Sequence, residues 1–552
     1  MSETVRERLN FIEQIIHDDL ETGKTNKVIT RFPPEPNGFL HIGHCKAICI
    51  NFETAKKYGG QTNLRFDDTN PTTEKTLYVD NIKNDIKWLG YDWEDREYYA
   101  SDYFDQMYDF AIDLIKKGLA YVDDSTSEEM AEQKGTPTKP GVNSPFRERS
   151  VEENLRLFQG MKNGKFEDGS RILRAKIDMA HPNMLMRDPM LYRIKKEHHH
   201  RTGDKWCIYP MYDFAHGQSD SIEEITYSLC SLEFIHHRPL YNWFIEKLEI
   251  FPSRQFEFAR MNVEYMITSK RRLLKLVENG IVTGWDDPRM PTIAGMRRRG
   301  YPAASLRTFC DKVGVAKREN LIEISLLESC IRDEMNKTTP RVMGVLNPLK
   351  MVITNYPEGQ VEQMETVNNP EDESMGTRTM PFSNTLYIER DDFMENANKK
   401  FYGASVGRNT RLKNGYIFHC DEAIKDANGE ITELRCTYYP ESRSGSDTSG
   451  IKAKGTLHWV SAEQALKVEV RMYDHLFNDP EPIQDGKDFM DFVNPNSLTI
   501  LENVYVEPSL ADAKPLDQFQ FLRKGYFCVD QDSTDDKLIF NRTVAMKTWK
   551  KK

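Results

Sequence analysis

Two histidines, His41 and His44, follow a stretch rich in proline and glycine, and their side chains could bind a phosphate group. Three prolines and a glycine within residues 33–38 prevent regular structure, so we expect a rigid loop between a strand at 27–32 and a helix at 43–57. A helix that begins at such a loop directs free backbone N–H groups at whatever lies over it, which suits an anion. Because a neutral imidazole can also donate to phosphate oxygens, the segment predicts a phosphate site.

A His-x-x-His pair on one helical face is also compatible with a structural role or a chance metal pair, and for such a pair alone the odds are roughly even. Gly43, between the two histidines, removes a side chain where a ligand could lie against the backbone. Together with the proline-rich loop and the preceding strand, this glycine favours phosphate over a metal ion.

A second candidate for anion binding is the run Thr268-Ser269-Lys270, in a predicted loop before a helix. The ammonium group of a lysine is a flexible point charge that can follow phosphates as they move. Alone this motif is weak, because any surface loop can contain serine followed by basic residues.

Carboxylates follow the second predicted strand, at 62–66, where Asp67 and Asp68 come directly after it. In open parallel sheets ligands bind at the carboxyl ends of the strands, so Asp67 is a candidate for holding a substrate ammonium group. For Asp68 we favour a role as the cap of the next helix. Tyr212, in the aromatic run 206–214, could present its hydroxyl to a polar substrate, although core packing is the more frequent role of such a residue.

The bulk composition bounds the class of protein. At 552 residues the chain is too long for one hydrophobic core, and about three to five domains are expected. No apolar run is long enough to span a membrane, and residues 1–20 lack the apolar core of a signal peptide, so we expect a cytoplasmic protein without membrane contact. The nine cysteines form no Cys-x-x-Cys pair, which supports neither a disulfide framework nor a zinc ribbon. The net charge of −11 argues against indiscriminate binding of polyanions, although local basic patches can still bind nucleic acid.

The elements that must position these residues are predicted from hydrophobic periodicity. A leading helix at 1–26 precedes strands and helices that alternate over 27–122 and again over 206–260, which indicates two halves of a doubly wound sheet. Between the halves, residues 123–205 are charged and rich in turns, as expected of an inserted domain. Residues 261–338 are helical in pattern, and residues 339–552 contain short strands that suit one or two β-barrels. Further expected elements are helices at 73–89, 151–161, 222–232 and 238–248, and a hairpin at 416–438.

The inserted segment carries basic residues that could follow a sugar-phosphate backbone, although a solvated charged face is the likelier interpretation from composition alone. These residues are Arg147, Arg149, Arg174, Lys176, Arg187 and Arg193.

Two anion-directed elements that bracket an α/β domain with an inserted lobe resemble the signature motifs of class I aminoacyl-tRNA synthetases. The run from His41 to His44 matches the first signature unaltered, and the run from Ile267 to Arg271 is similar to the second, with its serine and lysine kept. Longer stretches along nearly the whole chain resemble the glutaminyl-tRNA synthetase family. These stretches are residues 32–38, 64–70, 206–214, 284–292 and 525–528.

This resemblance implies a multidomain fold that combines α/β and all-β parts. It comprises a Rossmann-type catalytic domain with an inserted acceptor-stem-binding lobe, a helical subdomain and two C-terminal anticodon-binding β-barrels. The implied activity is that of a ligase that attaches L-glutamine to tRNA(Gln) through a glutaminyl adenylate, with Mg²⁺ accompanying ATP and no dedicated metal site. We expect a monomer that requires tRNA before it activates glutamine.

By position, the resemblance also implies the site residues. The catalytic candidates are His41, His44 and Lys270, which would stabilise the triphosphate. The ATP-binding candidates are Glu35, Pro36, Asn37, His41, Ile42, Gly43, His44, Cys45, Lys46, Ala47, Ser231, Arg260, Met261, Thr268, Ser269 and Lys270. The glutamine-binding candidates carried over in this way are Asp67 and Tyr212. Cys230 joins them because a neutral residue there fits an amide, and Arg31 joins them because it ends its strand at the same sheet edge as Asp67. The tRNA-binding candidates are Arg341, Gln520, Arg523 and Arg542.

Several alternatives share part of this pattern. A glutamyl-tRNA synthetase of the type that shares the β-barrels needs a cation for its substrate carboxylate, and that family places an arginine where this chain has Cys230. A short paralogue that glutamylates a tRNA base lacks the barrels. A nucleotidyltransferase that makes a dinucleotide would leave both the lobe and the barrels without a use, and a non-catalytic RNA-binding relative should have lost the phosphate groups.

The chain also departs from the glutaminyl family at a few positions. Glu224 and Tyr227 replace residues near the glutamine pocket, and His236 stands where relatives carry an acidic residue that contacts the acceptor stem. Residues 401–403 replace a more basic run used in anticodon reading. These positions bear on the fine geometry of the pocket and on individual tRNA contacts.

Overall fold

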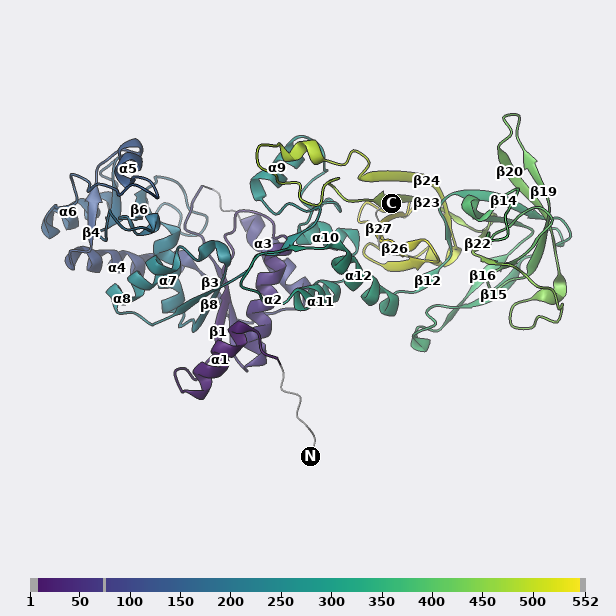
Figure 1. Ribbon diagram of the computed structural model, residues 1–552, viewed down its shortest axis with the longest axis horizontal. Helices are drawn as coiled ribbons and strands as arrows, with labels where there is room; N and C mark the ends of the chain where they lie inside the picture. The colour runs from purple at the N-terminus through teal and green to yellow at the C-terminus, as the bar shows by residue number, and fades with distance from the viewer. Residues whose placement is uncertain (1–7, 73–75, 547–552) are drawn as a thin grey trace. The chain divides into compact units, whose positions relative to one another are not determined.

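The computed structural model describes residues 8–72 and 76–546, and the chain divides into two compact units (Figure 1). Unit 1 extends to Asn262 and also includes Cys310–Ile322, whereas unit 2 comprises Val263–Phe309 and the chain from Glu323 onward. The expected leading helix is shorter than residues 1–26, because α1 spans Phe11–Glu21. Part of that prediction, residues 1–7, and the expected start of the helix at residue 73 lie outside the described residues.

Unit 1 contains the α/β elements. Its helices are α1 (Phe11–Glu21), α2 (Ile42–Lys57), α3 (Thr76–Trp88), α4 (Phe104–Lys116), α5 (Ser127–Lys134), α6 (Val151–Lys162), α7 (Tyr212–Ile222) and α8 (Arg238–Leu248). Its strands are β1 (Ile29–Phe32), β2 (Gln61–Phe66), β3 (Glu97–Tyr99), β4 (Ala120–Asp123), β5 (Ile172–Ala175), β6 (Met190–Ile194), β7 (Ile208–Pro210), β8 (Tyr227–Ser231), β9 (Arg254–Phe258) and β11 (Leu321–Ile322), with β10 (Asn262–Val263) at the unit boundary.

A parallel layer forms the centre of unit 1. Strand β1 pairs in parallel with β2, and β2 pairs with β3, whereas β8 and β9 form a second parallel pair. Thr226, just before β8, donates its backbone N–H to the carbonyl of Ile29 in β1 at 3.1 Å, which joins the two pairs. The layer therefore runs β3-β2-β1-β8-β9, the doubly wound arrangement predicted from the sequence.

The inserted segment folds on an antiparallel sheet of order β4-β5-β6-β7. Helices α4 and α6 pack on it through buried apolar residues such as Leu114 and Phe158. Residues 206–214 were expected to begin the second half of the parallel layer, but their strand, β7, pairs with β6 of the antiparallel sheet. Pro210 is the last residue of this strand, and Tyr212 then begins helix α7.

The prediction of a helix at 222–232 is wrong. Helix α7 ends at Ile222, and the following residues form strand β8, in which Tyr227 and Leu229 are buried. A central parallel strand is apolar on both faces, so its sequence cannot be distinguished by periodicity from a short buried helix.

Unit 2 combines helices with the all-β region. Its helices are α9 (Lys270–Glu278), α10 (Ile293–Arg299) and α12 (Ile324–Thr338), and α11 (Ala303–Val313) crosses the unit boundary. Its strands are β12 (Arg341–Val342), β13 (Gly344–Val345), β14 (Pro348–Ile353), β15 (Glu362–Val367), β16 (Thr377–Phe382), β17 (Thr385–Glu389), β18 (Asn409–Leu412), β19 (Ile417–Lys425), β20 (Ile431–Tyr438), β21 (Thr456–Leu457), β22 (Trp459–Ser461), β23 (Leu466–Tyr473), β24 (Leu498–Val506), β25 (Gln518–Phe521), β26 (Gly525–Val529) and β27 (Ile539–Val544).

Most strands of unit 2 form two barrel-like sheets, which confirms the prediction of β-barrels, and β15 and β16 form a separate two-stranded sheet (Figure 1). The first has the order β21-β18-β19-β20-β14-β17-β22 and encloses a core around Trp459. The second has the order β12-β25-β26-β27-β23-β24-β13 and encloses a core around Phe521 and Phe540. No helix among residues 8–72 and 76–546 is long and apolar enough to cross a membrane.

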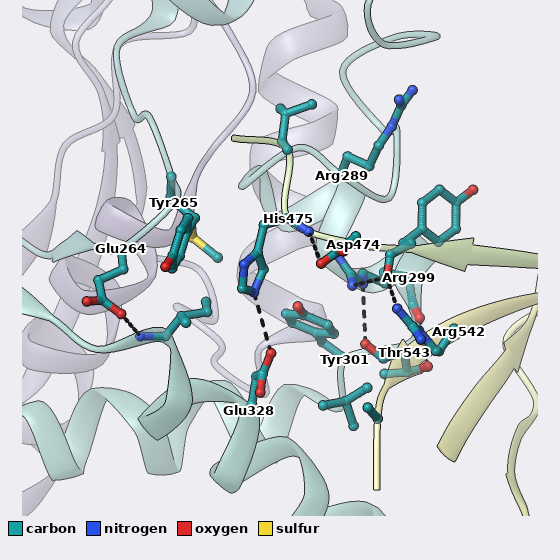
Figure 2. Close-up of a pocket in the computed structure, with 16 residues that line it drawn as sticks. Glu264, Tyr265, Arg289, Arg299, Tyr301, Glu328, Asp474, His475, Arg542 and Thr543 are labelled. Carbon is teal, nitrogen blue, oxygen red and sulfur yellow. Dashed lines mark hydrogen bonds and ion pairs between the residues drawn. The ribbon is translucent and has the colours of Figure 1, made fainter. Parts of the chain in front are cut away.

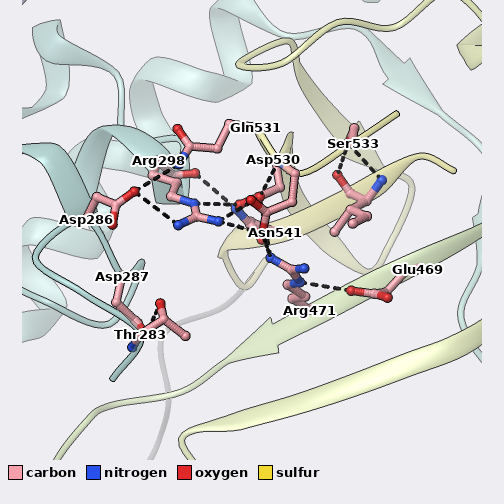
Figure 3. Close-up of polar contacts among 12 residues, drawn as sticks. Thr283, Asp286, Asp287, Arg298, Glu469, Arg471, Asp530, Gln531, Ser533 and Asn541 are labelled. Carbon is pink, nitrogen blue, oxygen red and sulfur yellow. Dashed lines mark hydrogen bonds and ion pairs between the residues drawn. The ribbon is translucent and has the colours of Figure 1, made fainter. Parts of the chain in front are cut away.

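A buried ion network joins the helical part of unit 2 to its second barrel (Figure 3). The carboxylate of Asp530, which is inaccessible to solvent, accepts hydrogen bonds from Nε of Arg298 at 3.1 Å and from Nη2 at 3.0 Å. Arg471 reaches the same carboxylate at 3.4 Å, and Asn541 also donates to it. Because one carboxylate holds two guanidinium groups from different elements, it fixes helix α10 against strands β23 and β27.

The contact between α10 and the barrel gives a stability prediction. Gly300 has φ +94°, and a Cβ placed there would lie 2.3 Å from Cβ of Cys528 and 2.6 Å from Oγ1 of Thr543. We expect Gly300→Ala to lower the free energy of unfolding of this unit by at least about 3 kcal/mol in urea titrations. Gly429, with φ +85° and open space around its Cα, is the matched control, and Gly429→Ala should cost only about 1 kcal/mol of backbone strain. Equal losses in the two variants would contradict close packing at Gly300.

Candidate active site

The turn that begins helix α2 is closed by its two histidines. His41 precedes the helix, and its Nδ1 accepts the backbone N–H of Gly43 at 3.1 Å. In return, Nδ1 of His44 accepts the backbone N–H of His41 at 3.1 Å. A Cβ at Gly43 would lie 2.9 Å from Cε1 of His41, so only glycine fits between the two rings.

Burial determines the protonation state of both histidines. Burial lowers the pKa of His44 to about 4, and burial together with the neighbouring His44 lowers the pKa of His41 well below its ordinary value. Both imidazoles are therefore neutral at pH 7. Because each Nδ1 accepts a backbone proton, the single ring proton of each lies on Nε2, where it can be donated to an anion.

A second centre of the site is the carboxylate of Asp220, which lies in α7 and is fully buried. Its Oδ1 accepts Nε of Arg31 at 3.0 Å and Nη1 of Arg65 at 2.8 Å. Its Oδ2 accepts the hydroxyls of Ser228 at 2.6 Å and Tyr241 at 2.9 Å. Burial opposes the ionised form, but the charges of Arg31, His216 and Arg65 outweigh burial and lower the pKa of Asp220 far below its ordinary range.

The structure brings the four glutamine-binding candidates together around this carboxylate. Nη2 of Arg31 lies 3.3 Å from Sγ of Cys230, and Nε of Arg65 donates to Oδ1 of Asp67 at 2.8 Å. The ring of Tyr212 stacks on His216 with 5.1 Å between ring centroids. Residues from β1, β2, α7 and β8 thus line one buried region.

One oxygen of this region has no hydrogen-bond partner. Oδ2 of Asp67 is buried and accepts no hydrogen bond, and Nδ1 of His216 lies 3.8 Å from it. Burial raises the pKa of Asp67, but the charge of Arg65 outweighs burial, so the pKa of Asp67 is lowered and the group is ionised at pH 7. A buried, ionised oxygen without a donor fits a ligand cation such as an ammonium group.

Other ATP-binding candidates of unit 1 differ in how far they are buried. Lys46 is buried and donates to the carbonyl of Ala259 at 2.9 Å, and Met261 is also buried. Arg260 forms ion pairs with Glu233 and with Glu319. Cys45 is directed into the interior, so its side chain does not line the turn of His41 and His44.

Asp68, His199 and His200 gather three potential metal ligands within 4.8 Å. However, Nδ1 of His199 accepts the backbone N–H groups of residues 201 and 202 at 3.2 Å, and its Nε2 lies 2.8 Å from the carbonyl of Asp68. Because both ring nitrogens of His199 already form hydrogen bonds, we interpret this cluster as a set of structural hydrogen bonds and not as a metal site. Asp68 holds the backbone and hydroxyl of Ser101 at 2.8 and 2.7 Å.

The basic residues of the inserted segment are largely committed to internal partners. Arg174 and Arg187 are buried, and Arg187 donates to three backbone carbonyls between Lys134 and Lys139 at 2.8–3.0 Å. Arg147 pairs with Asp188 at 2.7 Å. Because Arg174 and Arg187 are buried, they lie neither on a solvated face nor where they could contact phosphate, so both predictions are wrong for these two residues.

Further candidates lie in unit 2. Ser269 precedes helix α9 and Lys270 is the first residue of that helix. Arg341 and Gln520 lie opposite each other on the paired strands β12 and β25, although Gln520 is buried and donates to the hydroxyl of Tyr526 at 2.8 Å. Arg523 forms an ion pair with Asp392.

Arg542, another candidate, lines a cavity of about 110 Å³ in unit 2 (Figure 2). It donates to the carbonyl of Tyr473 at 2.7 Å, and Arg299 donates to the same oxygen at 3.3 Å. On the other side of the cavity, Tyr265 stacks on His475 with 4.4 Å between ring centroids. Arg542 therefore has an internal structural role whatever else it contacts.

Comparison with known proteins identifies the family. A family model described as the catalytic domain of class I tRNA synthetases (E and Q) matches residues 27–337, and two models of the anticodon-binding domains of the same family match residues 339–439 and 456–530. The chain belongs to the E and Q family of class I tRNA synthetases. This confirms the resemblance seen in the sequence.

Individual members of this family are similar over almost their whole length. A glutamine–tRNA ligase of Rhodopirellula baltica is 57% identical over 98% of this chain and 90% of its own length. A glutamine–tRNA ligase of Clostridium perfringens is 56% identical over 98% of both chains. A glutamine–tRNA ligase of Pseudomonas syringae pv. tomato is 55% identical over 98% of this chain and 95% of its own length.

Sequence reasoning on this synthetase missed Arg65, Asp220 and Ser228, which hold the candidate pocket in place. Asp220 is separated from Arg31 by 189 positions and from Arg65 by 155, so no local pattern links them. The signal available in the sequence was the run of polar or small residues at 216–220, which follows the strongly apolar segment 206–214. Polar side chains in a buried helix need hydrogen-bond partners, so this run indicated that such partners exist elsewhere in the chain.

The Asp220 carboxylate gives a second stability prediction. Asp220→Asn removes the carboxylate partner of the buried Arg31 and one of the carboxylate partners of the buried Arg65, so we expect the free energy of unfolding at pH 7 to fall by about 3 kcal/mol or more. Asp102→Asn is the matched control, because Asp102 pairs with Arg201 at 2.6 Å but is 45% exposed, and it should cost less than about 1 kcal/mol.

The wild type and Asp220→Asn can also be compared as a function of pH. Because the pKa of Asp220 is lowered in the folded state, its stabilisation is present above the ordinary value of about 3.9 and is lost as pH falls below it. The difference between the wild type and Asp220→Asn should therefore persist from pH 7 to about pH 4 and narrow only below it. A difference that already disappears near pH 6 would contradict an ionised, buried Asp220.

Proposed function

We propose that this chain attaches L-glutamine to tRNA(Gln) in two steps. In the first, the carboxylate of glutamine attacks the α-phosphorus of ATP and pyrophosphate leaves, and in the second the acyl group passes to the terminal adenosine of the tRNA. The names of the full-length relatives support this activity, and so does the family of the catalytic and anticodon-binding domains. Mg²⁺ enters with ATP in this scheme.

The choice of glutamine over glutamate is supported chiefly by one observation: the cations of the pocket are already paired. Arg31 uses its donors on Asp220, on the carbonyl of Leu229 and on Cys230, and Arg65 uses its donors on Asp67 and Asp220. Both guanidinium groups are thus already bound to carboxylates of the protein. Burial opposes the charged form of His216, but Asp220 raises its pKa to about 9, and its ring lies 3.7 Å from Asp220 and 3.8 Å from Asp67. A substrate carboxylate would have to compete with these carboxylates for a counter-ion, which is costly.

Cys230 strengthens this argument. Burial opposes ionisation of its thiol, but the charge of Arg31 outweighs burial and lowers the pKa of Cys230. Neither a thiol nor a thiolate attracts a carboxylate, whereas both can accept a hydrogen bond from the carboxamide of glutamine. We assign the α-ammonium of glutamine to Oδ2 of Asp67, which accepts no hydrogen bond, and the carboxamide to the side lined by Tyr212 and Cys230.

For ATP we assign the phosphates to the turn that begins α2. The neutral Nε2–H groups of His41 and His44, which lie at the N-terminal end of α2, can donate to phosphate oxygens. Lys270 supplies charge to the leaving pyrophosphate as the bond breaks. In this proposal Glu35, Asn37, Ser231 and the other positions implied by the family complete the nucleotide site.

The domains receive roles in the same proposal. Residues 27–122 and 206–260 form the catalytic domain, residues 123–205 contact the acceptor stem, and residues 261–338 carry Lys270. Residues 339–552 read the anticodon, for which Arg341, Gln520, Arg523 and Arg542 are the candidate contacts. The anticodon-binding family models that match residues 339–439 and 456–530 support this last role.

The proposed activity is tested by ATP–pyrophosphate exchange. We expect exchange with glutamine in the presence of tRNA, none with glutamate, and none with glutamine when tRNA is omitted. Exchange supported by glutamate would reject the assignment of the amino acid. Exchange without tRNA would reject only the tRNA requirement.

The role of Lys270 is tested separately. Because its charge acts mainly in the transition state, Lys270→Ala should lower the exchange rate at least about 100-fold while the affinity for tRNA changes less than about threefold. Lys275, on the same helix, pairs with Asp488 at 3.0 Å and serves as the control, and Lys275→Ala should leave the exchange rate nearly unchanged. A parallel loss of tRNA affinity in Lys270→Ala would contradict a role confined to activation.

A further inference from the structure

Three cysteines gather in the interior of unit 1 beneath the turn of His41 and His44. Cys45 and Cys49 lie one turn apart on the buried face of α2, and Cys310 reaches them from α11. Their sulfur atoms all lie within 4.8 Å of one another, and the sulfurs of Cys45 and Cys310 are 3.8 Å apart. Cys45 is inaccessible, whereas Cys49 and Cys310 are each 6% exposed.

This spacing fits a thiolate-bound metal ion. Two sulfurs bound tetrahedrally to Zn²⁺ at about 2.3 Å lie about 3.8 Å apart. Three protein ligands are also a known number for zinc, with water in the fourth position. A hydrogen bond between two thiols gives a similar distance, so the sulfur geometry does not by itself distinguish a metal site from a packed thiol cluster.

The neighbouring Lys46 favours a metal site over a packed thiol cluster. Its side chain is 2% exposed, and its ammonium group donates to the carbonyl of Ala259 at 2.9 Å. Among the residues that the structure describes, Lys46 forms no ion pair, although its charge interacts with Cys310 and, less strongly, with Glu319, whose carboxylate is already bound to Arg260. A buried cation without a directly bound counter-ion is costly, which points to a negative charge that the uncharged thiols do not supply.

A bound divalent ion would supply that charge. Each thiol releases its proton to solvent as its sulfur binds the ion, and three thiolates around one divalent cation leave a single net negative charge. The ammonium group of Lys46 balances this charge as an outer partner of the site. By contrast, Cys420 and Cys436, which oppose each other on β19 and β20, form only a pair.

We propose that Cys45, Cys49 and Cys310 bind one thiophilic d¹⁰ cation, of which Zn²⁺ is the representative, with Lys46 as the balancing charge. The ion would tie helix α2 to α11 directly below the turn formed by the two histidines. This site is independent of the proposed aminoacylation, because none of its arguments uses a substrate.

The test is metal titration of the reduced, metal-free full chain. Cd²⁺, added as a probe for zinc sites, should give a saturating thiolate-to-metal charge-transfer band at about one equivalent, and Zn²⁺ should displace it. Zn²⁺ should also raise the melting temperature of the wild type, because it binds the folded site. Cys49→Ser and Cys310→Ser should each weaken binding at least about tenfold and abolish the thermal shift, and Lys46→Met should weaken binding about tenfold.

Cys420→Ser is the matched control, because it removes a buried cysteine outside the cluster, and it should bind like the wild type. Circular dichroism of the metal-free proteins verifies that each variant is folded. If Cys310→Ser does not fold, Cys49→Ser and Lys46→Met decide the question.

Three outcomes would overturn the site. The first is a charge-transfer band of the wild type that does not saturate near one equivalent of Cd²⁺. The second is equal binding in the wild type and in the folded variants Cys49→Ser and Lys46→Met. The third is a signal that disappears when fresh reductant is added, which would assign it to disulfide formation among the thiols.

Discussion

A single buried carboxylate, that of Asp220, determines the geometry of the candidate glutamine pocket. Two arginines from different strands, Arg31 and Arg65, both bind its Oδ1, and two hydroxyls satisfy its Oδ2. All three charged groups are inaccessible to solvent, so each is stable only because the others are present. Through these arginines the carboxylate orients Asp67 on one side and Cys230 on the other.

This arrangement has a direct consequence for substrate choice. The arginines of the pocket, Arg31 and Arg65, are already paired with Asp220 and Asp67 before any substrate arrives. What remains available is an anionic oxygen on Asp67 and the uncharged surface around Tyr212. A site of this kind suits an ammonium group and an amide, and a second carboxylate would have to compete with Asp220 and Asp67 for a counter-ion.

The sequence predicted those features that depend on local patterns. The loop before His41 followed from its prolines, and Asp67 followed from its place at the end of a strand. The barrel-like sheets followed from short alternating segments with turn residues between them. For these features, the residues that specify the structure are neighbours in the chain.

The features that the sequence did not predict depend on distant contacts. The two arginine partners of Asp220 lie more than 150 positions away, and no periodicity connects them to it. Strand β8 was expected to be helical because a buried parallel strand is apolar on both faces. The basic residues of the insert were expected at the surface, but Arg174 and Arg187 have buried partners that only the folded chain brings close.

The central claim is that the Asp220 carboxylate organises the pocket for the amino acid and not for the nucleotide. The most direct measurement is the KM for glutamine and the KM for ATP in tRNA-supported exchange by folded Asp220→Asn. The account predicts that the KM for glutamine rises at least about tenfold while the KM for ATP changes less than about twofold. Equal increases in both constants, or no change in the KM for glutamine, would contradict it.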